Sequence, residues 1–256
     1  MKTRALLIRL AKQFPHSIAK KNHDFVGTMV GPIPSEVHKI VLCLDFDEEI
    51  LATTLEIKPD IIFTHHPFFF GSKTKILKYD EHKAYLNEKL KENNIALVSF
   101  HTNFDEGKGG MNDALAGLLN LKDVYAPINE PMMRVGYLDE SMPVLEFAEY
   151  AKRKLNVDYA LLVNYGNADI KKVAIIGGGG SRSYVVAKEE NADIYISGDA
   201  PHHVRRAIVA DKFNYLDVPH EVERAFMGAM KEIIKKIDPS LEVIILDHEK
   251  MPKVIL

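Results

Sequence analysis

Short apolar runs and longer amphipathic stretches alternate along the first half of the chain. The apolar run at residues 39–46 ends in polar positions, which is typical of a buried strand. The stretch at residues 80–93 places Tyr85, Leu86 and Leu90 at helical spacing among charged residues. This alternation predicts an α/β fold in which helices cover mostly parallel sheets. The expected strands are residues 39–46, 60–64 and 95–100, and the expected helices are 49–57, 80–93 and 111–121.

A second series of the same kind begins near residue 130, after a stretch that contains Pro127 and Pro131. We therefore expect two α/β lobes, residues 1–126 and 127–256, either separate or joined in one compact unit. Ser141 is expected to cap a helix at residues 142–155. The other expected helices are 183–191, 201–211 and 221–237, and the strands are 135–138, 159–165, 172–176, 193–197, 214–218 and 241–246.

Composition restricts the class of protein but not its activity. The chain has 256 residues, 46% hydrophobic and 27% charged, which is an ordinary globular composition. Its net charge of −3 and pI near 6.4 argue against a strongly basic nucleic-acid-binding protein. A local basic surface is still compatible with these values.

Three features bear on location. The single cysteine, Cys43, lies in an apolar run and is expected to be a buried hydrophobic residue. A lone cysteine forms no internal disulfide, which fits a reducing cytoplasm. No apolar run approaches the ~18–20 residues of a membrane span. Arg9 and Lys12 interrupt the apolar N-terminus, so we expect an amphipathic first helix rather than a signal peptide, and a cytoplasmic protein with no membrane partner.

The first candidate for chemistry is the adjacent pair His65 and His66, directly after the strand expected to end at Thr64. Ligands gather at the carboxyl ends of strands in open parallel sheets, so these imidazoles emerge where a site is expected. Pro67 keeps the residue before it extended. Adjacent histidines are also common on protein surfaces, so the pair indicates a metal site only if other candidate ligands lie near it.

The second candidate follows the next expected strand. Asp105 offers a hard carboxylate ligand. His101 and Asn103 could hydrogen-bond to metal ligands and so fix their orientation. The alternative is a capping aspartate beside a hydrogen-bonded loop histidine.

The third candidate lies between a strand and a long helix, where His220 and Glu223 stand three residues apart and can face one point. Glu221 or Glu223 could instead favour the positive end of the helix dipole. Three strand ends that deliver histidine or carboxylate to one face of a sheet predict a two-metal site between the lobes.

On these residues the chain resembles the Nif-three-like dinuclear-metal family, whose members are often labelled GTP cyclohydrolase I type 2 homologs. The resemblance covers nearly the whole chain, from about residue 24 to residue 223, and fits the short form of the family. Its motifs are residues 64–67, 101–105 and 198–203 and the late His220–Glu223 pair. It implies a toroidal homohexamer whose sites face an internal cavity. It also implies five metal ligands: His65, His66, Asp105, His220 and Glu223.

Two departures limit that resemblance. The early loop reads His-Asp-Phe-Val-Gly at residues 23–27 where the family has Asp-Asn followed by Gly-Leu, so it is assigned no role. Pro219 replaces the glycine of the last motif, and Arg224 leaves Glu223 as the available glutamate.

Two further segments have two interpretations each. The four glycines at 177–180 follow a strand and precede a helix, where backbone amides could hold an anion or simply form a tight turn. His202 and His203 could line a cavity as substrate contacts, whereas Asp199 just before them could cap a helix.

Histidine and carboxylate ligands without thiolate suit two divalent ions such as zinc, iron, manganese, cobalt or nickel. We therefore expect a metal-dependent hydrolase of a small nucleotide-like or phosphorylated substrate, with His101 as a candidate proton carrier. The alternative is a non-catalytic metal-binding ring that handles metal or serves as a scaffold.

Overall fold

The computed structural model describes residues 1–249 and 252–255. The chain divides into two compact units. Unit 1 contains Met1–Gly110 and Phe226–Glu249, and unit 2 contains Met111–Ala225 with the described part of Lys250–Leu256. The sequence predicted a break at residue 126, whereas here the second unit begins earlier and the C-terminal helix and strand return to the first.

Unit 1 is built on a five-stranded sheet in the order β1-β4-β3-β2-β11. The last four strands in that order are parallel, and only β1 runs antiparallel, at the edge beside β4. Every residue of β3 and β4 is buried, as expected for parallel strands covered on both faces. The strands are β1 (Gly27–Val30), β2 (Lys39–Cys43), β3 (Ile61–Thr64), β4 (Ala96–Ser99) and β11 (Glu242–Ile245).

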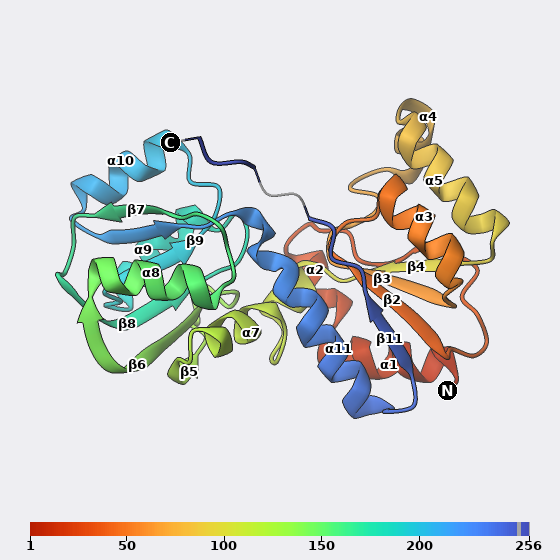
Figure 1. The fold of residues 1–256 in the computed structure, drawn as a ribbon, viewed down its shortest axis with the longest axis horizontal. Helices are drawn as coiled ribbons and strands as arrows, with labels where there is room; N and C mark the ends of the chain where they lie inside the picture. Colours follow the sequence, from red (N-terminus) through yellow and green to blue (C-terminus); the bar gives the residue numbers. More distant parts are fainter. Residues whose placement is uncertain (250–251, 256) are drawn as a thin grey trace. The chain divides into compact units, whose positions relative to one another are not determined.

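Helices cover both faces of this sheet (Figure 1). On one face Ile50 and Leu51 of α3 and Leu86 and Leu90 of α5 join alternate strand residues in a buried cluster. Aspartates cap both helices, because Asp47 and Asp80 accept hydrogen bonds from backbone amides three residues on. The helices of this unit are α1 (Thr3–Gln13), α2 (His16–Lys21), α3 (Glu48–Ile57), α4 (Lys73–Tyr79), α5 (Glu81–Glu92), α6 (Thr102–Glu106) and α11 (Ala225–Ile237).

Unit 2 contains a six-stranded mixed sheet in the order β5-β6-β8-β9-β10-β7. Only the β8–β9 and β9–β10 pairs are parallel, and the other three pairs are antiparallel. The strands are β5 (Lys122–Tyr125), β6 (Arg134–Pro143), β7 (Leu161–Asn164), β8 (Asp169–Ile175), β9 (Ile194–Ser197) and β10 (Asn214–Asp217).

The core of unit 2 includes a cluster in which α9 and α10 pack on the sheet around Tyr195 and Tyr215. α7 and α8 contact β6 and β8, and Figure 1 shows α8 and α9 on opposite sides of the sheet. The helices are α7 (Met111–Leu118), α8 (Val144–Lys154), α9 (Tyr184–Glu189) and α10 (His202–Ala210), with short 3₁₀ helices η1 (Ser181–Ser183) and η2 (His220–Arg224).

The α/β class and the presence of two sheets are as the sequence predicted, and Cys43 is buried. The expectation of a mostly parallel sheet holds in unit 1 but is wrong for unit 2, where three of the five strand pairs are antiparallel. The amphipathic first helix is α1. The cap predicted at Ser141 is wrong, because β6 continues through this residue and Pro143 occupies the N-cap of α8 without a side-chain hydrogen bond. Among the described residues, no helix is long and apolar enough to cross a membrane.

Candidate metal centre

Two neighbouring parallel strands of unit 1 deliver the histidines of the candidate centre. β3 ends at Thr64, and backbone amides of His65 and His66 donate to the carbonyl of Leu44 at the end of β2. The Thr64 hydroxyl donates to the carbonyl of His66 at 2.9 Å and lies 2.8 Å from the Ser99 hydroxyl at the end of β4. The strand ends therefore fix where the two imidazoles leave the sheet.

Three imidazoles converge at this point. One ring nitrogen from each of His65, His66 and His101 lies within 4.8 Å of the other two. The ring centroids of His65 lie 5.1 Å from both His66 and His101. The His65 side chain is fully buried, and Phe226 of α11 packs 5.2 Å from its ring. Such convergence of three nitrogen donors is what a divalent metal ion requires.

Two carboxylates fix the orientation of two of these rings. Nδ1 of His66 donates to Asp45 at 2.7 Å, and Nδ1 of His101 donates to Asp24 at 2.7 Å. Each ring therefore carries its proton on Nδ1 and directs the lone pair of Nε2 elsewhere. Histidines that bind metals are commonly held by a carboxylate in this way.

Asp24 is the more deeply set of the two carboxylates, with 4% of its side chain exposed. Burial opposes its ionisation, but the hydrogen bond and charge of His101 outweigh burial and lower the pKa of Asp24 to about 2. The hydroxyl and amide of Thr102 also donate to this carboxylate. Asp24 is therefore ionised at neutral pH and accepts the hydrogen bond from Nδ1 of His101.

Asp105 lies near His65, in the short helix α6. Its Oδ1 is 3.5 Å from Nε2 of His65, and its side chain is 9% exposed. The amides of Phe104 and Asp105 donate to the carbonyl of His101, which starts this helix. Asn103 accepts from the backbone amide of His101 and donates to the carbonyl of Phe14, so it shapes the loop and is not seen to orient a ring.

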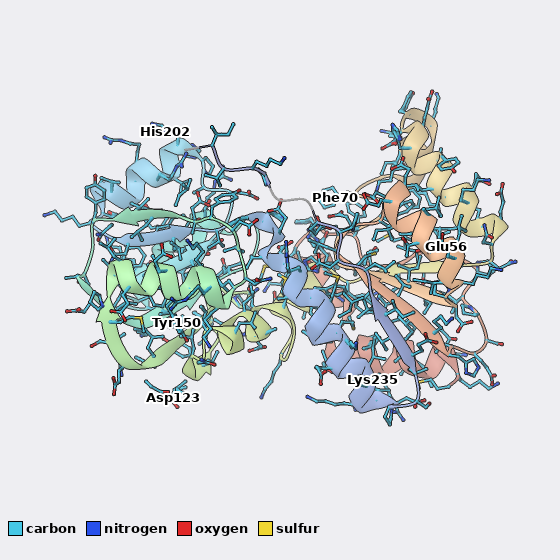
Figure 2. All side chains as sticks on the ribbon, viewed as in Figure 1. Glu56, Phe70, Asp123, Tyr150, His202 and Lys235 are labelled. Atoms are coloured by element: carbon cyan, nitrogen blue, oxygen red, sulfur yellow. The ribbon has the colours of Figure 1, made fainter. Side chains whose placement is uncertain are left out.

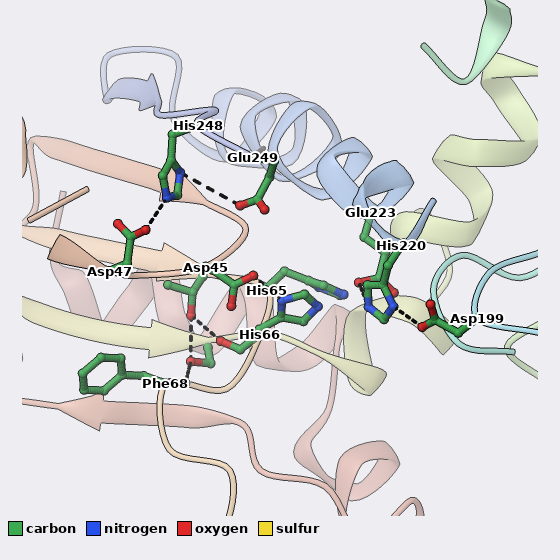
Figure 3. Close-up of polar contacts among 12 residues, drawn as sticks. Asp45, Asp47, His65, His66, Phe68, Asp199, His220, Glu223, His248 and Glu249 are labelled. Carbon is green, nitrogen blue, oxygen red and sulfur yellow. Dashed lines mark hydrogen bonds and ion pairs between the residues drawn. The ribbon is translucent and has the colours of Figure 1, made fainter. Parts of the chain in front are cut away.

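Unit 2 holds a second histidine–carboxylate group, at η2 after β10. Nε2 of His220 lies 3.0 Å from Glu223, and its Nδ1 lies 2.6 Å from Asp199 (Figure 3). The hydrogen bond to Glu223 outweighs the opposing effect of burial and, with Asp199, raises the pKa of His220 to about 9. Without a metal ion, this imidazole is therefore protonated at neutral pH between two carboxylates.

The glycine run between β8 and η1 makes room for this group. Gly178 has φ +65°, and a Cβ at this position would lie 2.0 Å from Oε1 of Glu223. Its carbonyl accepts from the amide of Gly198 at 2.7 Å and the hydroxyl of Ser197 at 3.0 Å. The run is therefore a close-packed turn beneath Glu223.

The donor atoms in both units suit a metal ion. Imidazole nitrogens and carboxylate oxygens bind zinc, iron, manganese, cobalt and nickel, and no thiolate is needed. The residues present in unit 1 fit such an ion because three nitrogens converge while carboxylates hold the far side of two rings.

A family model described as Duf34/NIF3 (NGG1p interacting factor 3) matches residues 1–252. The chain belongs to the Duf34/NIF3 family. A relative from Clostridium perfringens, named GTP cyclohydrolase 1 type 2 homolog, is 32% identical over 244 residues, which are 91% of this chain and 92% of the relative. A relative of the same name from Methanocaldococcus jannaschii is 31% identical over 231 residues, which are 88% of this chain and 91% of the relative.

Solved structures of other proteins show the same fold as this Duf34/NIF3 chain. A Staphylococcus aureus hypothetical protein has a TM-score of 0.88 at 24% identity and covers all of this chain and 99% of its own. Reduced HcgD from Methanocaldococcus jannaschii has a TM-score of 0.80 at 27% identity, covering 96% of this chain and 98% of its own.

The Duf34/NIF3 fold brings together some of the residues singled out in the sequence and separates others. His65, His66, His101 and Asp105 lie in unit 1, whereas His220 and Glu223 follow a strand of the sheet in unit 2. The expectation that all three strand ends belong to one sheet is therefore wrong. His202 and His203 are exposed on α10 (Figure 2 labels His202), and Pro201, not Asp199, occupies its N-cap.

Sequence reasoning missed the carboxylates that hold the histidines. Asp45 could have been found, because it follows β2, the parallel neighbour of β3. Asp24 carried no such signal, because its place depends on the antiparallel pairing of β1 with β4. Asp199 was interpreted as a cap, and its contact with His220 joins residues 21 positions apart.

Proposed function

We propose that this Duf34/NIF3 protein is a metal-dependent hydrolase of a small nucleotide-like or phosphorylated substrate. The observation that carries the proposal is the convergence of three imidazoles, two of them oriented by buried or half-buried carboxylates. The name of its relatives, GTP cyclohydrolase 1 type 2 homolog, supports a nucleotide-like substrate. Opening a purine ring and hydrolysing a phosphoester both require an activated water molecule.

The residues proposed to hold metal are His65, His66 and Asp105 in unit 1 and His220 and Glu223 in unit 2. Two divalent ions of the zinc, iron, manganese, cobalt or nickel group would supply Lewis-acid polarisation and water activation. Asp45 and Asp24 keep the protons of His66 and His101 on Nδ1, which leaves each Nε2 as a base.

His101 has two roles open to it. Its Nε2 could bind metal beside the other two histidines, or it could accept a proton from the reacting water, because a carboxylate-oriented imidazole is an effective general base. A His101→Ala variant separates them. Loss of bound metal indicates a ligand, whereas full metal content with slow turnover indicates a proton carrier.

The test combines metal analysis with a turnover screen over nucleotides and phosphoesters. The wild type, reconstituted with each candidate metal, is compared with a His65→Ala/His66→Ala variant. The matched control is His38→Ala/His82→Ala, which removes two histidines whose side chains are 74% and 85% exposed. We expect metal binding and turnover in the wild type and control, and neither in the first variant.

Equal turnover by the wild type and the His65→Ala/His66→Ala variant would exclude the hydrolase proposal. Stoichiometric metal with no turnover on any substrate would instead favour the metal-handling alternative. The toroidal homohexamer expected from the resemblance remains a prediction, and light scattering would then give six times the 28.9 kDa mass of the chain.

A further inference from the structure

Unit 1 contains a cavity of about 710 Å³ beside α2, a volume within the range of small-molecule sites. Its lining combines cationic and aromatic side chains. The polar lining residues are His16, Lys20, His23, Asp24, Thr28 and Lys73, and the apolar ones include Phe25, Met29 and Phe69.

The charge of this cavity is opposite to that of the whole chain. Lys20 and Lys73 contribute two cationic side chains, and Asp24 is the one acidic residue of the lining. The chain as a whole carries −3. A positively charged cavity in a negatively charged protein raises the local concentration of anions.

Lys73 is solvent-exposed, but two contacts hold its ammonium group in position. Its ammonium donates to the carbonyl of Met29 at 2.7 Å and lies 4.8 Å from the ring centroid of Phe69. The ammonium has three donors, so this arrangement leaves donors for an anion.

An aromatic surface lies next to these cations. Phe25 lines the cavity and is 40% exposed. Its ring packs edge-on against the ring of Phe70, with 5.5 Å between the ring centroids, and Phe70 is 66% exposed. Two neighbouring phenyl rings left open to solvent offer a face on which a planar ring can stack.

Asp24 connects the lining of this cavity to the candidate metal centre. Asp24, which is part of its lining, accepts the hydrogen bond from Nδ1 of His101 at 2.7 Å. One residue, Asp24, therefore belongs both to the cavity lining and to the group that orients His101.

We propose that this cavity binds a small phosphorylated aromatic molecule of the size of a nucleoside monophosphate. Lys20, Lys73 and His23 bind the phosphate, and Phe25 stacks on the aromatic ring. This inference specifies the substrate site of the proposed hydrolase and rests on that function only for its link to catalysis.

The test measures binding by calorimetry to the metal-free, full-length chain at low salt, because exposed charges are screened at high salt. The probes are guanosine 5′-monophosphate, guanosine and inorganic phosphate. Lys20→Ala/Lys73→Ala removes the cations, and the matched control Lys21→Ala/Lys75→Ala removes their exposed neighbours, which do not line the cavity. Phe25→Leu removes the stacking surface.

We expect the monophosphate to bind more tightly than either fragment. The Lys20→Ala/Lys73→Ala variant should weaken it at least tenfold and the control less than twofold. Phe25→Leu should weaken the monophosphate severalfold and leave phosphate binding unchanged. Absence of monophosphate binding, equal loss in the control, or guanosine binding as tightly as its monophosphate would each overturn the inference. If a short oligonucleotide bound more than tenfold more tightly than guanosine 5′-monophosphate, the inference would also be overturned, in favour of a nucleic-acid partner.

The two proposals fail in distinguishable ways. Binding to the metal-free chain with no turnover after metal loading would contradict the hydrolase and leave the binding site standing. Turnover that is unaffected by the Lys20→Ala/Lys73→Ala variant would contradict the binding site and leave the hydrolase standing.

Discussion

At the scale of single residues, the candidate centre depends on carboxylates that contact histidines rather than a metal. Asp45 and Asp24 come from the end of β2 and the loop before β1, and each fixes one ring. An imidazole held by a carboxylate is both oriented and more basic. The proposed affinity for metal should therefore depend on residues outside the proposed ligand set.

Asp45→Asn should weaken metal binding in unit 1 by about tenfold to a hundredfold, the usual cost of losing such a partner. Because Asp45 is half-exposed, the fold should be retained. Competition with a chromophoric chelator measures the affinity, and Asp139→Asn, at a carboxylate that is 76% exposed, is the control. An affinity equal to that of the wild type would mean that Asp45 does not support a ligand.

In the metal-free chain, His220 should titrate near pH 9 by NMR, well above the ordinary value of 6.5. The raised pKa means that its contribution to stability is complete below pH 6.5 and is lost as the pH rises through about 9. Metal must displace this proton, so affinity at His220 should increase with pH over the same interval.

Glu223→Gln supplies the control for that titration, since the hydrogen bond to Glu223 is the largest cause of the shift. The midpoint should move down toward 6.5. A midpoint that stays near 9 in Glu223→Gln would assign the shift to Asp199 instead.

At the scale of elements, the turn after β8 shows how backbone conformation makes room for the side chain of Glu223. Gly178→Ala would place a methyl group against Glu223 at a positive φ. We expect the free energy of unfolding, measured by chemical denaturation, to fall by about 1–3 kcal/mol. The pH midpoint of the His220 titration should also fall.

Gly228→Ala is the matched control, because nothing lies within 4 Å of its Cβ position in α11. It should stabilise the chain by roughly 0.5–1 kcal/mol, as alanine does in a helix. If both substitutions had the same effect, the close approach at Gly178 would not matter for stability.

Elements with strong periodicity were predictable, and those defined by pairing were not. The apolar runs at β2, β3 and β4 and the amphipathic pattern of α5 gave these elements to within a few residues. β1 was missed because Gly27–Val30 is short, begins with glycine and is half-exposed, so its strand character comes from pairing with β4. The positions of His65, His66 and Asp105 followed from strand ends, whereas that of Asp24 required the fold.

At the scale of the whole molecule, the main segment of unit 2, residues 111–225, is inserted between two segments of unit 1. Its sheet and its tyrosine-centred core lie within one continuous segment. Residues 111–225 expressed alone should therefore fold, with dispersed amide NMR signals. Residues 1–110 alone should not, because Phe226, Met230 and Ile234 of α11 and the pairing of β11 with β2 are missing.

The control is a chain of residues 1–110 and 226–249 in which a Gly/Ser linker joins residue 110 to residue 226. This chain should recover a folded unit 1. Well-dispersed NMR signals from residues 1–110 alone would show that α11 and β11 are dispensable.

The parallel pairing of β11 with β2 also sets an order of events during synthesis. His248 binds Asp47 across 201 positions (Figure 3), and β2 has no β11 beside it until the ribosome has added Glu242–Ile245. At roughly 5–20 residues per second, the apolar edge of β2 would wait about 10–40 s for its neighbour. The emerging chain therefore exposes an open strand edge between the synthesis of β2 and that of β11, and this is the interval in which a chaperone would protect it.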